Sequence, residues 1–182
     1  MSYGILLLRL VLGAILFGHG AQKLFGWWGG PGLEGTAGFF GGLRFRAPLA
    51  IALTASLAEA GGGVLVALGL LTPFAALALV VVMLNAIGTV HFRNGFWNGN
   101  GGYEFNLLVL ASAAALGATG GGRFSLDNWF GWAGSLSGLW WGVGVLAVAG
   151  LVSLVTLTLG RRPDVPAAVE EHEPATLRAS AA

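Results

Sequence analysis

Long apolar segments alternate with short polar stretches along this chain, and the pattern predicts helices that cross a membrane. Five such segments cover residues of about 4–26, 48–71, 73–92, 104–120 and 138–160. Each approaches the roughly 20 residues that a helix needs to span a hydrocarbon core about 30 Å thick. We therefore expect an all-α, polytopic transmembrane bundle with a four-helix core in residues 1–128, an additional span in 129–160 and a disordered polar tail in 161–182.

The connections between these segments are rich in glycine and aromatic residues. Residues 27–47 and 93–103 form two such loops, and a short interfacial helix is expected around TAGFF in the first. Residues 71–73 alone join the second and third segments, which predicts a tight antiparallel hairpin. The Glu-Glu-His-Glu run at 170–173 is interpreted as solvated tail rather than as a metal site.

Composition excludes several classes of protein. Hydrophobic residues make up 55% of the 182 positions and charged residues 9%, whereas a soluble domain carries about 25% charged residues. The formal net charge of +1 gives no support for binding to nucleic acid. The chain has no cysteine, so it forms no disulfide, Cys-ligated metal site or thiol nucleophile. Because the N-terminus lacks a basic region and a cleavage site, the first apolar segment is interpreted as a retained span.

Lysine and arginine residues gather on one side of the predicted bundle. With five spans, the 27–47 loop, the 93–103 loop and the tail share that side, which holds Lys23, Arg44, Arg46, Arg93, Arg161 and Arg162. The opposite side carries Arg123. Positive loops stay in the cytoplasm, so we expect a multi-pass protein of the cell (inner) membrane whose two loops and tail are cytoplasmic.

Polar side chains inside the apolar segments are the candidate functional residues. A charge at mid-helix costs roughly 2.5–3.5 kcal/mol on insertion scales, so several of them in one chain indicate a buried polar site. Aligning antiparallel helices by their ends, at about 1.5 Å per residue, predicts a middle layer of Glu59, Asn85 and His19. A second layer, nearer the cytoplasmic face, contains Gln22, Lys23, His91, Glu104 and Asn106.

Two of these residues carry specific expectations. Lys23 and Glu104 are expected to neutralise each other, as buried charges usually must. Glu59 is expected on a tightly packed, protein-facing side of its helix, because the residues at helical spacing around it are Ser56, Gly62 and Gly63.

Some interpretations stay open. Arg9 has no partner in these layers, so it would reach the backbone end of another helix, snorkel outward, or meet Thr72 or Thr119. Polar residues near helix ends could instead snorkel or cap, and Asn85 could simply bridge two helices. A haem held by two histidines is disfavoured, because His19 and His91 lie at different depths.

Several stretches together resemble the DoxX family of bacterial membrane proteins. They are LRLVLGAILFGHGAQKLFG, LAEAGGGVLVALGLLTPFAAL, YEFN and GRFSLD, and the resemblance covers about residues 5–128. It implies a four-helix membrane core and a role as a subunit of a quinone-coupled oxidoreductase, such as thiosulfate:quinone oxidoreductase, or of a thiol or oxidative-stress complex. The family's recurring polar positions match Arg9, His19, Lys23, Glu59, Glu104 and Asn106.

The leading hypothesis is an integral membrane subunit of a redox system that binds a quinone inside the bundle. A quinone needs proton donors and acceptors near its carbonyl oxygens and an apolar slot for its tail. Glu59 and His19 are the candidate catalytic residues; the candidate quinone-binding residues are Arg9, Lys23, Asn85, His91, Glu104 and Asn106. The chain carries no metal, haem, flavin or dinucleotide motif, so electrons would come from a partner subunit or a bound donor.

Two other functions remain open. The chain could be a non-catalytic anchor or assembly factor for a partner oxidoreductase, with its polar layers only locking the helices together. It could also be a small transporter or proton pathway, since buried Glu and His suit proton relays, although no inverted repeat is evident. The expected partners are the lipid bilayer and either a redox subunit or a second copy of the chain, and not nucleic acid.

Overall fold

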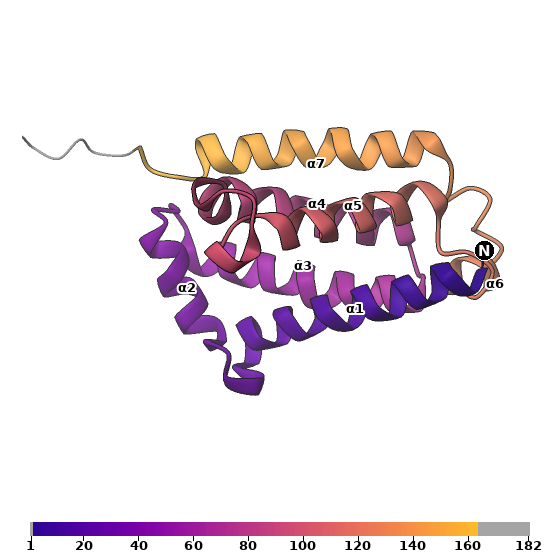
Figure 1. Ribbon diagram of the computed structural model, residues 1–182, viewed down its shortest axis with the longest axis horizontal. Coiled ribbons are helices and arrows are strands. Elements are labelled where there is room, and N and C mark those ends of the chain that lie inside the picture. The colour runs from indigo at the N-terminus through magenta and orange to yellow at the C-terminus, as the bar shows by residue number, and fades with distance from the viewer. Residues whose placement is uncertain (1, 164–182) are drawn as a thin grey trace, which may run out of the picture.

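The computed structural model describes residues 2–163, and it confirms the expected all-α bundle (Figure 1). The predicted tail lies outside the described residues from position 164 onward, together with its acidic run. The α-helices are α1 (Ser2–Phe25), α2 (Gly32–Gly42), α3 (Pro48–Leu68), α4 (Thr72–Ala86), α5 (Glu104–Thr119), α6 (Leu126–Trp129) and α7 (Leu139–Leu159). Shorter helical turns are η1 (Trp27–Gly29), η2 (Ile87–His91), η3 (Phe92–Asn94) and η4 (Asn98–Asn100).

Several helices are long and apolar enough to cross a membrane. Four helical runs of the described chain have the length and apolar composition of a span: α1, α3, the run Thr72–Asn94 that begins with α4, and α7. The 16 residues of α5 cover about 24 Å, which is less than the hydrocarbon core, and this helix packs against α4 and α7. The predicted segment at 104–120 is therefore shorter than a full span.

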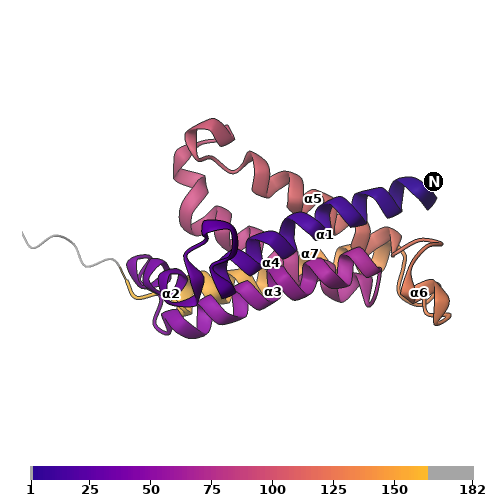
Figure 2. The ribbon, with the colours of Figure 1, turned by 90° about the horizontal axis from the view of Figure 1, so that it is seen from below.

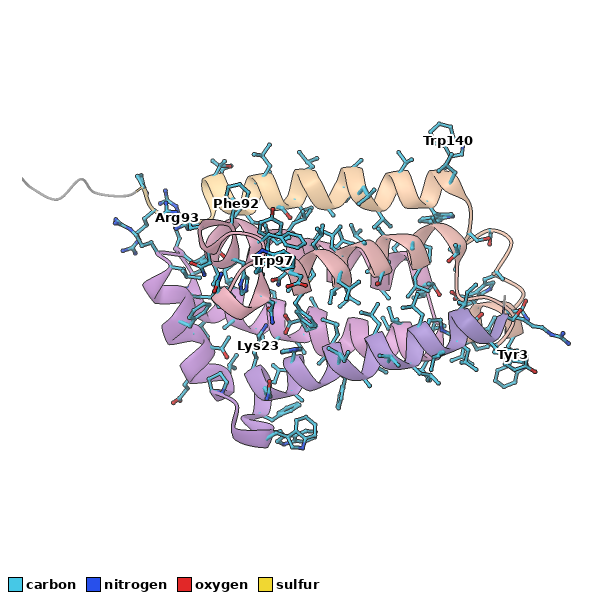
Figure 3. All side chains as sticks on the ribbon, viewed as in Figure 1. Tyr3, Lys23, Phe92, Arg93, Trp97 and Trp140 are labelled. Carbon is cyan, nitrogen blue, oxygen red and sulfur yellow. The ribbon has the colours of Figure 1, made fainter. Side chains whose placement is uncertain are left out.

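The two ends of the bundle hold different parts of the chain (Figure 1). The N-terminus, the α3–α4 turn and α6 lie at one end, while α2, η1–η4 and the end of α7 lie at the other. Figure 2 shows the segment from η2 to the start of α5 rising away from α1 and α3. Exposed aromatic side chains mark both ends, with Tyr3 and Trp140 at one and Phe92 and Trp97 at the other (Figure 3). This distribution is typical of residues at a membrane–water interface.

Small residues bring α1 and α3 into backbone contact. A Cβ atom added to Gly20 would collide with the backbone of Ala60, and one added to Gly63 would lie 2.6 Å from the backbone nitrogen of Phe17. A Cβ on Gly13 would likewise lie 2.5 Å from the carbonyl oxygen of Gly63. Membrane helices pack in this way when small residues let their backbones approach. These contacts determine the register between the two helices.

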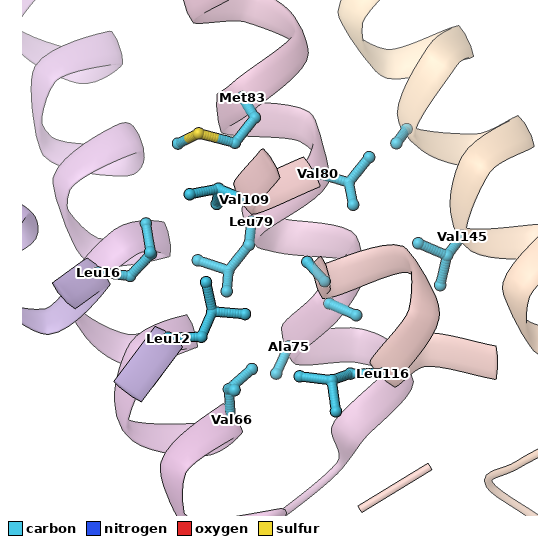
Figure 4. Close-up of a cluster of buried hydrophobic side chains, with 13 residues drawn as sticks. Leu12, Leu16, Val66, Ala75, Leu79, Val80, Met83, Val109, Leu116 and Val145 are labelled. Atoms are coloured by element: carbon cyan, nitrogen blue, oxygen red, sulfur yellow. The ribbon is translucent and has the colours of Figure 1, made fainter. Parts of the chain in front are cut away.

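A hydrophobic core fills the centre of the bundle where the long helices meet (Figure 4). Leu16 of α1 and Leu79 of α4 are fully buried, and Leu116 of α5 and Val145 of α7 are nearly so. Figure 4 shows these side chains pointing toward one another from four helices. Because lipid is as apolar as this core, tight packing rather than water exclusion holds the helices together.

The end of α7 is tied to the connection between α2 and α3. The Arg46 N–H donates to the Gly160 carbonyl at 2.9 Å, and the Arg162 N–H donates to the Arg44 carbonyl at 2.9 Å. The Arg161 Nε donates to the carbonyl of Leu43 at 3.0 Å. These bonds gather four arginines of the predicted positive side at one end of the bundle.

Candidate functional site

An ion pair between Lys23 of α1 and Glu59 of α3 is the centre of the candidate site. The Lys23 Nζ donates to both Glu59 carboxylate oxygens at 2.6 Å. The Glu59 side chain is 3% exposed and the Lys23 side chain 30% exposed, so the carboxylate is buried and the ammonium is half-buried. Glu59 shares a buried face with Ser56, Gly62 and Gly63, which confirms the tightly packed side expected for it.

The predicted pair of Lys23 and Glu104 is wrong. The Glu104 carboxylate instead accepts the Asn98 N–H at 3.0 Å and closes its own loop. The error comes from aligning α1 and α3 by their ends. The contact of Gly20 with Ala60 places Glu59 about one helical turn further along α1 than that alignment does, within reach of Lys23.

The ion pair lies in the wall of a cavity of about 730 Å³. The cavity is lined by residues of α2, α3, the α4–η2 run and α7, together with Lys23 of α1. Most of its lining is apolar, including Phe39, Phe40, Val81 and Val82. The polar side chains that line it are Lys23, Thr36, Thr54, Glu59, Asn85, Thr89, His91 and Thr156. Its size is in the range of small-molecule sites, about 300–1,000 Å³.

Asn85 faces this cavity from α4 and also contacts α7. Its Nδ2 donates to the Val81 carbonyl at 2.9 Å and to the Ser153 Oγ at 3.2 Å. Because a carbonyl can only accept, this contact fixes which amide atom is nitrogen. The Oδ1 is then buried without a hydrogen-bond partner among the described residues. The prediction that Asn85 bridges two helices is therefore confirmed, and its free oxygen needs a separate explanation.

His91 reaches the cavity through a local irregularity at the end of α4. The helix widens into a π-type turn over Ile87–His91, a feature that often occurs at functional sites. The His91 Nδ1 lies 2.7 Å from the carbonyl oxygen of Gly101. Since that oxygen can only accept, Nδ1 carries the hydrogen, and in the neutral ring Nε2 presents a lone pair.

Besides Arg9, three predicted site residues lie outside the cavity lining. His19 is exposed on α1, and its ring lies against Phe105 with centroids 5.8 Å apart. Glu104 is engaged with its own loop, as described above. Asn106 is buried on α5, where its Nδ2 contacts the Met83 sulfur at 3.6 Å. The structure therefore brings Glu59 and Asn85 of the expected middle layer to one cavity, whereas His19 is not part of its lining.

Arg9 belongs to a second polar cluster, at the opposite end of α1. Arg9 is 1% exposed, and its guanidinium donates to the backbone carbonyls of Val66, Ala67, Gly121 and Phe124. Two of these carbonyls, of Val66 and Ala67, belong to the last turn of α3, whose carbonyls have no N–H four residues further along the helix, and the Val66 carbonyl also accepts the Gly69 N–H at 3.0 Å. The expectation that Arg9 reaches the backbone end of another helix is confirmed. It lies 14 positions from Lys23, about 21 Å along α1, and does not line the cavity.

Asp127 completes this cluster and was missed by the analysis of the sequence. Its carboxylate accepts the N–H groups of Leu71 and Thr72 at 2.7 and 3.0 Å, and the Thr72 hydroxyl at 2.6 Å. It caps the start of α4, next to Leu71, whose φ of 49° is unusual for a residue with a side chain. The sequence does contain an indication of this role, because Asp127 is the last residue of the GRFSLD stretch, which lies on the same side of the predicted bundle as Arg9.

Comparison with known proteins agrees with the resemblance seen in the motifs. The sequence model of the DoxX family matches residues 4–92. A curated protein of Bacillus subtilis (strain 168), named "Putative oxidoreductase CatD", is 36% identical over 124 residues, which are 68% of this chain and 84% of that protein. No solved structure matches the chain.

Proposed function

The chain belongs to the DoxX family, and from that membership we propose that it is the membrane component of a redox system and binds a quinone in the cavity beside Lys23 and Glu59. The redox assignment is supported by the name of the Bacillus subtilis relative. The quinone assignment is our own inference. It is carried by one observation, a largely apolar cavity of about 730 Å³ with a buried carboxylate and its half-buried ammonium partner in its wall.

The chemistry of this cavity suits a quinone ring. Reduction of a quinone to a hydroquinone takes up two electrons and two protons. The Lys23 ammonium can donate a proton, and the Glu59 carboxylate, 2.6 Å from it, can accept a proton and pass it on. Phe39, Phe40 and the valines of α4 supply apolar surface for the ring and tail. Electrons are proposed to come from a partner redox subunit, because no electron carrier is evident in the sequence.

The test is quinone binding and reduction by a matched pair of variants. Glu59→Gln keeps the size of the side chain but removes its charge, whereas Glu34→Gln makes the same change at an exposed position of α2 that does not line the cavity. We expect Glu59→Gln to lower quinone-reduction activity in membranes at least tenfold and Glu34→Gln to leave it unchanged. Binding of a short-tailed ubiquinone to the purified protein provides the independent readout.

Two results would contradict the proposal. If the purified protein binds no quinone but co-purifies with a soluble redox subunit, the chain is an anchor or assembly factor. If Glu59→Gln retains full quinone reduction, the cavity does not take part in the chemistry. A second copy of the chain as partner remains a prediction, and size measurement of the purified complex tests it.

We also propose that the end bearing α2 faces the cytoplasm, because four arginines gather there. The chain lacks cysteine, so single cysteines can report the orientation. Gly38 and Gly134 are exposed and have open space around them, so Gly38→Cys and Gly134→Cys should be tolerated. A membrane-impermeant maleimide should label Gly134→Cys in intact cells and Gly38→Cys only after permeabilisation. The reverse pattern would overturn the orientation.

A further inference from the structure

The polar groups of the cavity wall are mostly hydrogen-bond acceptors, because their hydrogens are already used within the protein. Each threonine that lines the cavity donates its hydroxyl hydrogen to a backbone carbonyl of its own helix. The donor–acceptor pairs are Thr36 to Gly32 at 2.7 Å, Thr54 to Ala50 at 2.8 Å, Thr89 to Asn85 at 2.7 Å and Thr156 to Val152 at 2.8 Å. A hydroxyl in this state offers only its lone pairs to a ligand.

The two nitrogen-bearing side chains of the α4–η2 run follow the same rule. Asn85 donates its amide hydrogens to Val81 and Ser153, and its Oδ1 stays unpartnered. His91 donates its Nδ1 hydrogen to Gly101, so the neutral ring offers Nε2 as an acceptor. Among the described residues that line the cavity, the strong donor is the Lys23 ammonium, which donates to both oxygens of Glu59.

We propose that this cavity recognises the reduced, hydroxyl-bearing form of its ligand, a hydroquinone, and that His91 Nε2 accepts the hydrogen of one hydroxyl. This inference rests on the proposed quinone site. A quinone carbonyl can only accept hydrogen bonds, so apart from Lys23 the polar groups of this wall present acceptors to its acceptor oxygens. A hydroquinone has the same ring and tail but carries two O–H donors. The difference between the two forms is therefore one of hydrogen-bond direction.

The expected preference can be given as a ratio of affinities. One additional hydrogen bond without a competing donor corresponds to a factor of about 10 in the dissociation constant. Preferential binding of the reduced form also stabilises it relative to the oxidised form. A tenfold preference raises the midpoint potential of the bound two-electron couple by about 30 mV.

The experiment measures binding to the purified protein in detergent, without oxygen, with three probes that share one ring and tail. They are decylubiquinone, decylubiquinol and the dimethyl ether of decylubiquinol, which lacks both O–H groups. We expect the quinol to bind about tenfold more tightly than the quinone, and the dimethyl ether to bind no better than the quinone. Titration calorimetry reports the affinities, and redox titration of the bound couple should show the upward shift.

Variants then test the role of His91. His91→Phe keeps an aromatic ring but removes the acceptor, so the quinol should lose about fivefold in affinity while the quinone stays within twofold. Tyr3→Phe removes a polar group from an exposed ring outside the cavity lining and should alter neither affinity. Thr89→Val, which is close to isosteric, removes another acceptor and should also reduce quinol affinity. It replaces His91→Phe as the test if that variant does not fold.

The outcomes separate this inference from the proposed function. Quinone binding as tight as quinol binding overturns the inference and leaves the quinone site intact. Equal binding of the quinol and its dimethyl ether also overturns it, because the O–H groups would not be recognised. Failure of both quinone and quinol to bind overturns the proposed function and the inference together.

Discussion

Replacement of Arg9 by leucine should strongly destabilise the protein, since this side chain joins three segments. Its guanidinium donates four hydrogen bonds to backbone carbonyls of α3 and the 121–124 loop. Hydrogen bonds from a charged donor contribute about 1.5–3 kcal/mol each, but burial of the charge costs several kcal/mol. Arg9 also interacts electrostatically with Asp127, which the substitution leaves buried and without its cation. We expect a net loss of about 3–5 kcal/mol.

The assay is reversible unfolding of the purified protein in mixed micelles, followed by circular dichroism. Arg93→Leu is the matched control because Arg93 is exposed at the other end of the bundle, and it should change the free energy of unfolding by less than about 0.5 kcal/mol. Arg9→Lys keeps the charge but lacks the planar guanidinium group, so its loss of unfolding free energy should lie between those of Arg9→Leu and Arg93→Leu. A loss below about 1 kcal/mol for Arg9→Leu would refute the view that these bonds hold the end of the bundle together.

Three further predictions concern other contacts. Gly20→Ala should lower the free energy of unfolding by about 1–3 kcal/mol, because the added methyl group forces α1 away from α3. Gly18→Ala is the control, since Gly18 has open space around it and its replacement should leave the stability unchanged. Equal effects of the two substitutions would contradict the close approach of the helices. Lys23→Met should be more destabilising in the same assay than the double variant Lys23→Met/Glu59→Leu, because the single change leaves a buried carboxylate without its cation. Asp127→Asn should lower the unfolding temperature by weakening the cap of α4, and unchanged stability would argue against that role.

Local features of the chain were read correctly from the sequence because they depend on neighbouring residues. Hydropathy predicted the long apolar helices and the membrane environment, and the small residues around Glu59 predicted its buried face. The hairpin at 71–73 was also predicted, and the structure ends α3 at Leu68 and begins α4 at Thr72. Each of these features follows from helical periodicity, from span length or from the chemistry of a short turn.

Pairing between helices could not be read in the same way. Aligning helix ends assumes that two helices begin and end at equal depth, and a difference of one turn moves every facing pair by about 5.4 Å. The backbone contact of Gly20 with Ala60 sets the true register, and through it Lys23 meets Glu59 rather than Glu104.

The sequence by itself determined that this protein is a helical membrane bundle with several buried polar groups. Only the tertiary structure decided which of those groups meet. It separated Arg9, which binds backbone carbonyls at one end, from Lys23 and Glu59, which lie beside a cavity near the other. The physical reason is that hydrophobicity is a property of each segment by itself. An ion pair or a cavity instead depends on the register between helices that are distant in sequence. The packing of small side chains sets that register.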